Sequence, residues 1–252
     1  MKKLLFALMA VIALASCERQ KPYSISGKFE IPDSLNLGDT IIAREPLDGT
    51  YVYMLELSGE PVDSALVENE TFTFTGKVSE KDPFFAYIAC DYAYGIIAVE
   101  PGEYNMTIGE EVLAYGSPTN DAINDIDAKV AEIEEGIGER LMAAIDEAGG
   151  YPNDSIMMPF YIEFNEKYES LINSVYEKNK KNLVGVYAVN IITSGAQSLD
   201  ELEMMLEDYD EYIANSPLME ARRDYLREGA ARQMYLNLQD DDLEDIDFDE
   251  DE

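Results

Sequence analysis

The chain of 252 residues contains no histidine, no tryptophan and only two cysteines. Without histidine it lacks the residues of Ser-His-Asp and Cys-His catalysis, of His-ligated zinc sites and of the commonest general base. No Cys-x-x-Cys and no Ser-x-x-Lys sequence occurs either, which excludes dithiol redox chemistry and the Ser–Lys nucleophile class. We therefore predict a protein that is not an enzyme and that has no cofactor and no metal site.

Basic residues are scarce. The sequence has 18 Lys and Arg against 52 Asp and Glu, a formal net charge of −34. A surface of this charge repels phosphate backbones, so we expect no nucleic-acid partner. It also repels anionic lipid headgroups, and its simplest role is to keep the protein soluble.

Long apolar runs are absent apart from one near the N-terminus. Residues 4–14 are 11 consecutive apolar residues that follow Lys2 and Lys3. This pattern is typical of a signal peptide, and a membrane-spanning helix would need about 20 such residues. The run ends in Leu-Ala-Ser-Cys at residues 14–17, which resembles a bacterial lipobox.

The lipobox resemblance implies that residues 1–16 are a lipoprotein signal peptide. The mature chain would begin at Cys17, carry acyl chains such as palmitate there, and be anchored by them to a membrane rather than span it. The expected location is the cell envelope outside the cytoplasm, at the outer membrane. An ordinary signal peptide that happens to end in cysteine is the alternative.

The second cysteine has no partner within the mature chain. With Cys17 used by the lipid, Cys90 cannot form an intramolecular disulfide. It ends an apolar segment, residues 84–90, that is typical of a buried strand. We interpret Cys90 as a small core residue rather than a reactive thiol.

After a lipidated tether at residues 17–22, residues 23–118 are predicted to form a β-domain. Segments of alternating apolar and polar residues are separated by turn signals such as Asp48-Gly49 and Pro101-Gly102. The predicted strands cover residues 23–29, 40–44, 51–57, 61–67, 71–75, 84–90, 96–99 and 104–108. The fourth and fifth should form a hairpin that turns at residues 68–70. About eight short strands at this spacing favour an antiparallel β-sandwich or barrel.

Residues 119–239 have an apolar period of 3.6, which predicts a helical domain of about five helices and an α+β fold class for the chain. The first helix carries one apolar stripe: Ile123, Ile126, Val130, Ile133, Ile137, Leu141, Ile145 and Ala148. The second contains Pro159, which should lie in its first turn because proline kinks a helix interior. Helices at 183–193, at 199–213 after the capping box Ser198–Glu201, and from Ser216-Pro217 onwards complete the set.

The chain ends in an acidic block. Ten of the 13 residues from 240 to 252 are Asp or Glu, a composition that predicts disorder. Alternating acids in this tail are a feature of calcium-binding loops, but the tail lacks the glycine and the later glutamate of an EF-hand loop. The densest basic cluster precedes it: Arg222, Arg223, Arg227 and Arg232. The tail folds back on this cluster in one hypothesis, and the cluster is a solvated mixed-charge surface in the other.

The order of these parts resembles the N-terminal portion of thioredoxin-like, peroxiredoxin-related envelope lipoproteins. The stretches that carry the resemblance are residues 25–29, 62–67, 72–78 and 116–120, and the helical matches are looser. In that family a lipobox, a β-domain of unknown function and a helical segment precede a thioredoxin fold with Cys-x-x-Cys. Here the acidic tail stands where the thioredoxin fold would begin, so the resemblance does not extend to redox activity.

Two kinds of residue remain as candidates for a site. Tyr92 and Tyr94 flank a predicted strand turn and could anchor a partner or a sugar, although local packing is the alternative. Carboxylates are abundant, and a glycan hydrolase needs only two of them at a fixed separation. Most of them, however, fall on predicted polar faces or turns.

We expect the protein to act as a non-enzymatic binding, adaptor or scaffold module of the envelope. Its partners would be the membrane, through the lipid, and an envelope protein or a second copy of the chain. The alternatives are a ligand- or glycan-binding protein, with an apolar pocket at the helix–sheet junction, and a carboxylate-based glycan hydrolase. The hydrolase would require two close carboxyl groups, one of them with a raised pKa.

Overall fold

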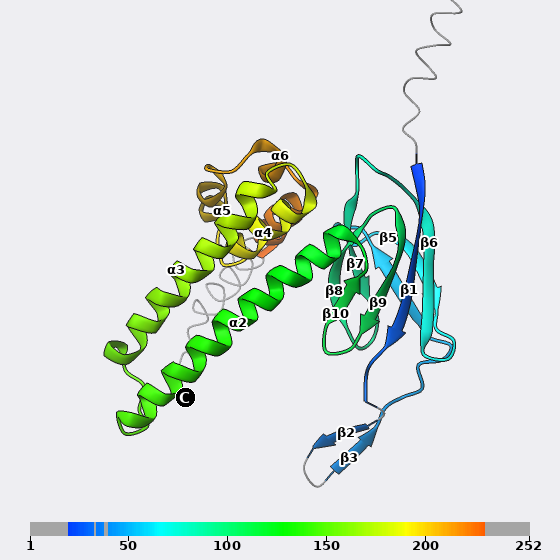
Figure 1. Ribbon diagram of the computed structural model, residues 1–252. Helices are drawn as coiled ribbons and strands as arrows, with labels where there is room; N and C mark the ends of the chain where they lie inside the picture. Colours follow the sequence, from blue (N-terminus) through cyan, green and yellow to red (C-terminus); the bar gives the residue numbers. More distant parts are fainter. Residues whose placement is uncertain (1–19, 33, 38–39, 230–252) are drawn as a thin grey trace, which may run out of the picture. The chain divides into compact units, whose positions relative to one another are not determined.

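A computed structural model describes residues 20–32, 34–37 and 40–229, without side-chain detail at 34–37 and 40–43 (Figure 1). Cys17, Arg232, the predicted signal peptide and the predicted acidic tail lie outside these residues. The chain divides into two compact units, Met1–Ala128 and Lys129–Glu252. This division falls ten residues after the predicted domain boundary at residue 118, because the first turns of helix α2 pack on the β-strands.

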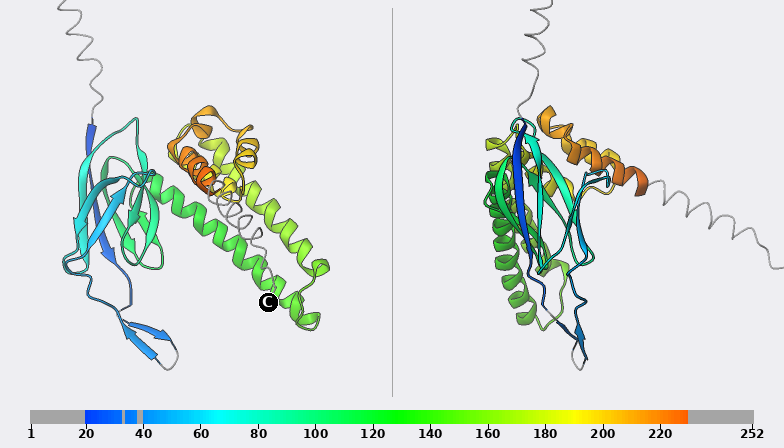
Figure 2. Two further views of the ribbon diagram at one scale, coloured as in Figure 1. Left: turned by 180° about the vertical axis from the view of Figure 1, so that it is seen from behind. Right: turned by 90° about the vertical axis from the view of Figure 1, so that its right-hand side faces the viewer.

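The α+β fold class is confirmed: within the described residues, ten strands precede the helices. The strands are β1 (Gln20–Phe29), β2 (Ser34–Leu37), β3 (Thr40–Ala43), β4 (Tyr51–Leu55), β5 (Pro61–Leu66), β6 (Thr71–Ser79), β7 (Phe84–Ala89), β8 (Tyr94–Val99), β9 (Gly102–Ile108) and β10 (Val112–Tyr115). They form two four-stranded sheets, β10-β9-β1-β6 and β5-β4-β7-β8, and a separate ribbon, β2-β3 (Figures 1 and 2).

Three details of the sheets differ from the predictions. The predicted all-antiparallel pairing is wrong in one place, since β1 pairs with β9 in parallel. The predicted tether to residue 22 is too long, because β1 begins at Gln20. Strands β5 and β6 are joined by a tight turn, but β5 pairs with β4 and β6 pairs with β1, so they are no hairpin.

The tight turn between β5 and β6 has the expected chemistry. Asn69 and Glu70 have φ angles of 53° and 59°, and Glu68 bridges to Thr71. Asparagine tolerates this left-handed backbone, whereas glutamate seldom adopts it. The Glu70 N–H donates to Asp48 Oδ1 (3.1 Å) and its carbonyl accepts from the Phe29 N–H (3.0 Å), so contacts outside the turn hold it in place.

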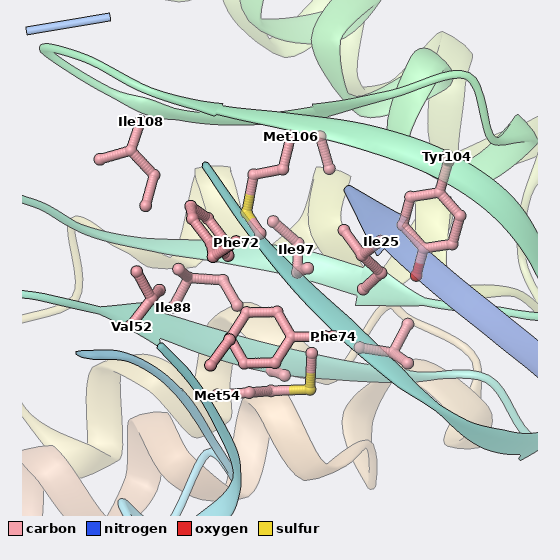
Figure 3. Packing of buried hydrophobic residues seen from close by; sticks show 14 of the residues in the cluster. Ile25, Val52, Met54, Phe72, Phe74, Ile88, Ile97, Tyr104, Met106 and Ile108 are labelled. Carbon is pink, nitrogen blue, oxygen red and sulfur yellow. The ribbon is translucent and has the colours of Figure 1, made fainter. Parts of the chain in front are cut away.

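The core lies between the two four-stranded sheets and follows from strict alternation along their strands. Fully buried side chains come from both sheets, among them Ile25, Phe74 and Met106 from one and Met54 and Ile88 from the other (Figure 3). Their neighbours along each strand point outward. Burial of each such side chain contributes about 1.5–3 kcal/mol to stability, so this core is the main source of stability of the β unit.

Two aromatic rings of the core lie on cross-strand glycines. Tyr23 is paired with Gly76, and Gly27 with Phe72, across the antiparallel pair β1–β6. A Cβ added to Gly27 would meet the Phe72 ring at 2.1 Å, and one added to Gly76 would meet the Tyr23 hydroxyl at 2.5 Å. The absence of a side chain therefore provides the space that each ring fills. These glycines belong to the stretches 25–29 and 72–78.

Helix α2 (Pro118–Glu147) begins on the edge strand β8. The Asn120 side chain is buried; its Oδ1 accepts from the Ala98 N–H (2.9 Å) and its Nδ2 donates to the Ala98 carbonyl (2.9 Å) and to Ser117 Oγ (2.8 Å). Asn120 thus gives both outward backbone groups of Ala98 a partner, as another strand would. Ile123 and Ile126 are buried one and two turns later.

The helical unit contains the rest of α2 and the helices that follow. These are α3 (Asp154–Lys178), α4 (Leu183–Thr193), α5 (Leu199–Leu206), α6 (Glu211–Ala214) and a helical segment at 217–229. Pro159 is the sixth residue of α3, so its predicted place in the first turn is wrong. The single predicted helix over 199–213 is divided in two, because Asp210 accepts a hydrogen bond from the Tyr212 N–H and starts α6.

The core of the helical unit is small and is formed mainly after α2. Its fully buried side chains are Ile172, Ala188, Val189, Thr193, Leu202, Ile213 and Met219. Of the predicted α2 stripe, Ile137 is the one residue beyond Ala128 that is buried, and the others are half-buried or exposed. No helix among the described residues is both long enough and apolar enough to cross a membrane.

The arginines of the predicted basic cluster that are described here have local partners. Arg222 donates to the carbonyls of Ser194 (2.6 Å) and Ala196 (2.9 Å), just beyond the end of α4. Arg223 pairs with Glu203 (2.6 Å), and Arg227 with Asp224 (2.6 Å). These contacts favour the interpretation of the cluster as a mixed-charge surface over the hypothesis that the acidic tail folds back and pairs with these arginines.

The glycine–ring packing predicts the effect of one added methyl group. Gly27→Ala should destabilise the β unit by about 2–3 kcal/mol, because neither the backbone nor the Phe72 ring has room for it. Amide hydrogen exchange of β1 and β6 would measure this loss. Ser26→Ala, on the exposed side of the same strand, is the control. Combined with Phe72→Leu, Gly27→Ala should cost markedly less, and equal costs in both backgrounds would contradict the ring contact.

The Asn120 contacts predict the effect of removing the amide. Asn120→Leu should cost about 2 kcal/mol, because the Ala98 N–H loses its partner in a buried place and the Ala98 carbonyl keeps only the Tyr104 hydroxyl (3.3 Å). The readout is faster hydrogen exchange at β8 and in the first turns of α2. Asn105→Leu, an exposed position on β9, makes the same substitution without that loss and should leave exchange unchanged. Equal exchange in the two variants would contradict the docking role of Asn120.

Candidate functional site

The outer surface of the sheet β5-β4-β7-β8 carries a group of tyrosines. Tyr51 and Tyr53 alternate with the buried Val52 and Met54 on β4, so both point away from the core. In the register of the sheet, Tyr53 is opposite Ala89 of β7, which is opposite Tyr94 of β8. Tyr87 of β7 lies on the same surface, two residues before Ala89. We call Tyr51, Tyr53, Tyr87 and Tyr94 the tyrosine face.

The rings of the tyrosine face form two contacting pairs. Tyr87 and Tyr94 are stacked with ring centroids 4.7 Å apart, and Tyr51 and Tyr53 lie 6.2 Å apart. The exposed fractions are 48% for Tyr51, 44% for Tyr53 and 62% for Tyr94. Aromatic side chains on a rigid sheet offer a large contact area at little entropic cost, and their hydroxyls add hydrogen-bonding capacity. This surface is therefore suited to binding rather than to chemistry.

The phenol of Tyr94 stays neutral at physiological pH. Its partial burial, together with charge repulsion from Tyr87 and a hydrogen bond to it, raises the pKa of Tyr94 to about 12. At neutral pH the hydroxyl therefore remains a hydrogen-bond donor as well as an acceptor.

The structure separates the two tyrosines proposed from sequence. Tyr94 is the first residue of β8 and belongs to the tyrosine face. Tyr92 lies in the preceding turn, is 40% exposed, and donates a long hydrogen bond of 3.5 Å to the carbonyl of Glu45. The local contact of Tyr92 matches the packing alternative more closely than an anchoring role.

Tyr51, Tyr53 and Tyr87 were not among the site residues predicted from the sequence. The signal was present, because tyrosines at positions 51 and 53 alternate with apolar residues and must share one side of a strand. What the sequence did not show is that β4, β7 and β8 are neighbours. Tyr53 and Tyr94 are 41 positions apart in sequence, and only the strand order brings their side of the sheet together.

The helical unit offers two adjoining depressions between α2 and α3, with volumes of about 500 and 420 Å³. Both are lined by Ile133 and Lys167. Glu163, at the second depression, contacts Arg140 (2.8 Å) and Lys167 (2.8 Å). Hydrogen bonds from these two cations lower the pKa of Glu163 to about 2. A general acid of a glycan hydrolase needs the opposite shift, so this place gives the hydrolase hypothesis no support.

Glu203 and Glu220, on the helices that follow α4, are shifted the same way. Arg223 lowers the pKa of Glu203, and Arg227 lowers that of Glu220, mainly through hydrogen bonds. Over the described part of the chain, no three Asp, Glu or Cys side chains gather closely enough to hold a metal ion. Of the geometric features described, the tyrosine face is the best-formed candidate site.

Cys17, the predicted lipidation site, lies outside the described residues, and the other cysteine is described. Cys90 directly follows β7, is half-buried and packs against the core of the β unit. This position agrees with its interpretation as a small core residue.

Comparison with known proteins finds one family model that matches part of the chain, residues 23–123. No curated protein matches the chain significantly. The matched stretch contains the glycine–ring pairs, Asn120 and the whole tyrosine face, and it ends in the second turn of α2. Residues 23–123 match the family model described as "Domain of unknown function (DUF4369)".

Proposed function

We propose that the protein is a non-enzymatic, lipid-anchored module of the cell envelope that binds a partner through the tyrosine face. One observation carries this proposal: four tyrosines, three of them more than 40% exposed, gather on one rigid sheet whose other side is the core. Tyrosines of this kind are enriched among the residues that dominate binding energy at interfaces. The partner expected is an envelope protein, for which the module acts as an adaptor or scaffold.

The resemblance to thioredoxin-like envelope lipoproteins supports the same proposal. Residues 23–123 match a family model, and the helices expected after the β-domain are present. The Cys-x-x-Cys of the redox domain is absent from the sequence. We therefore propose that the chain performs the binding role of the non-catalytic part of such proteins.

Glycan binding is a second candidate function for the same surface. The stacked pair Tyr87–Tyr94 presents an exposed aromatic platform, and such platforms bind the apolar faces of sugar rings. In either case the tyrosines supply contact area and hydrogen bonds, and no residue of the face supplies a nucleophile or base. The two candidates differ in what the surface retains from envelope material.

The proposed anchor is tested at Cys17. Cys17→Ala should abolish metabolic labelling with an alkyne fatty acid and move the protein out of the membrane fraction. Loss of Lys2 and Lys3 with the signal peptide changes the formal net charge from −34 to −36. A mature protein of this charge is repelled by anionic lipids, so it has no electrostatic attachment to the membrane. Cys90→Ala is the matched control and should keep both the label and the membrane location. Labelled, membrane-bound Cys17→Ala protein would refute the anchor.

The proposed binding surface is tested by removing two rings. Immobilised mature protein should retain a specific envelope component, and Tyr53→Ser with Tyr94→Ser should reduce its amount about tenfold or more. Tyr225→Ser, which removes a tyrosine 66% exposed on the helical unit, is the control and should retain it fully. A retained protein supports the adaptor role, and retained glycan supports the second candidate. Equal retention by all three forms would refute a role for the tyrosine face.

A further inference from the structure

Helix α3 is much longer than the helix that packs on it. Its 25 residues span about 37 Å, whereas the 11 residues of α4 span about 16 Å. Tyr168, in the C-terminal half of α3, donates a hydrogen bond to the Ile191 carbonyl of α4 (3.4 Å). This contact identifies the side of α3 that faces α4. Farther along, Ile172 and Tyr176 are buried. The same side of α3 continues toward its N-terminus, beyond the reach of α4.

That continuation is apolar and exposed. Tyr161 lies seven residues before Tyr168, and Met158 lies eighteen before Tyr176, so helical geometry puts each on the α4-facing side. With their neighbours they form what we call the α3 patch: Met157 (43% exposed), Met158 (51%), Tyr161 (62%) and Ile162 (50%).

The opposite side of α3 is the one that meets α2. Glu163 contacts Arg140 of α2, and the Arg140 guanidinium lies 5.7 Å from the centre of the Phe160 ring. In helical projection, Glu163 and Phe160 point away from Tyr161 and Met158. The α3 patch is therefore left uncovered by α2 as well as by α4.

Charge selects the partner. Residues 155–162 contain no charged side chain, in a chain with 52 acidic residues. When two copies of one chain meet through the same surface, their charges are identical, and repulsion is avoided only where the surface has none. A cationic partner would instead be attracted by an acidic surface. A neutral, apolar patch on a strongly acidic protein matches a second copy of itself.

We infer that the α3 patch is the contact surface of a homodimer, in which α3 of each copy packs on α3 of the other about a twofold axis. Its four side chains expose on the order of 400 Å² per copy, about half of the roughly 800 Å² per partner of a standard interface, so residues around the patch would complete the contact. The inference goes beyond the proposed function and does not depend on it, since the tyrosine face lies on the β unit.

Sedimentation velocity of the mature chain without its lipid tests the dimer. Wild type should sediment as a dimer at micromolar concentration, and more tightly at high salt, because screening weakens repulsion between two acidic copies. Met158→Glu with Tyr161→Glu should weaken association at least tenfold. Met204→Glu with Tyr225→Glu replaces the same residue types at exposed positions of the same unit, adds the same charge, and should still dimerise. Circular dichroism would verify that each variant keeps its helix content.

A charge-exchange experiment removes any dependence on loss of folding. Met158→Lys with Tyr161→Lys should associate weakly with itself, and an equimolar mixture with the Glu variant should form a mixed dimer. The Tyr53→Ser, Tyr94→Ser protein should dimerise like wild type, so failure of the tyrosine face and failure of the dimer are distinguishable. A wild-type monomer at about 100 μM would overturn the inference. The inference would also be overturned if monomeric wild type bound phosphatidylcholine vesicles and the Met158→Glu, Tyr161→Glu variant did not. That result would assign the patch to a lipid surface.

Discussion

The β unit depends on the packing of two aromatic rings onto glycines across the strand pair β1–β6. Tyr23 lies on Gly76 and Phe72 lies on Gly27, and each ring occupies space that any other residue at the glycine would fill. β1 is an inner strand, with β6 on one side and β9 on the other, so the same contacts fix the strand on which the first sheet is built. The register of that pair also aligns Ile25 with Phe74 in the centre of the core. The Gly-Lys pairs of the two stretches that resemble the envelope lipoproteins thus have a structural reason, one that requires no ligand.

Charge is the second constraint, and it acts on the surface rather than on the fold. With 52 acidic and 18 basic residues, most carboxylates cannot have a cationic partner, and they stay in water where their mutual repulsion is screened. The basic residues that are present in the helical unit serve local purposes: Arg222 holds carbonyls beyond the end of α4, and Arg140 joins α2 to α3. Against this background, neutral surfaces are rare and informative. The tyrosine face and the α3 patch differ from the rest of the surface in two ways: the residues that define them carry no charge, and they include aromatic rings.

Much of the fold could be predicted because period and turn chemistry are local. Alternation located most strands, Ser198 and Pro217 marked helix starts, and Asn69 marked a left-handed turn. The predictions that were wrong concern features that depend on contacts between residues distant in sequence. The chain between β5 and β6 turns as a hairpin does, but Phe72 and Phe74 pair with β1, which takes β6 into the other sheet. The parallel pairing of β1 with β9 has the same origin. At the break between α5 and α6, the local cap by Asp210 is joined by a distant contact, because the Asp210 N–H donates to the Tyr176 hydroxyl (2.9 Å). Of the four residues of the tyrosine face only Tyr94 was predicted, because the others come from strands that only the fold makes neighbours.

The two surfaces have consequences for each other if both function as argued. A homodimer through α3 would carry two tyrosine faces and, with the proposed anchor, two lipids. Binding of one face to a multivalent envelope component then makes binding of the second intramolecular, which strengthens attachment without any new contact. The gain exists only for a partner that repeats its binding site, as a polymer or an oligomer does, and it vanishes for a monovalent protein. Weak affinity of each tyrosine face is therefore compatible with firm retention. On this argument a surface built from a few rings, with no charge to steer its partner, can be sufficient for an adaptor.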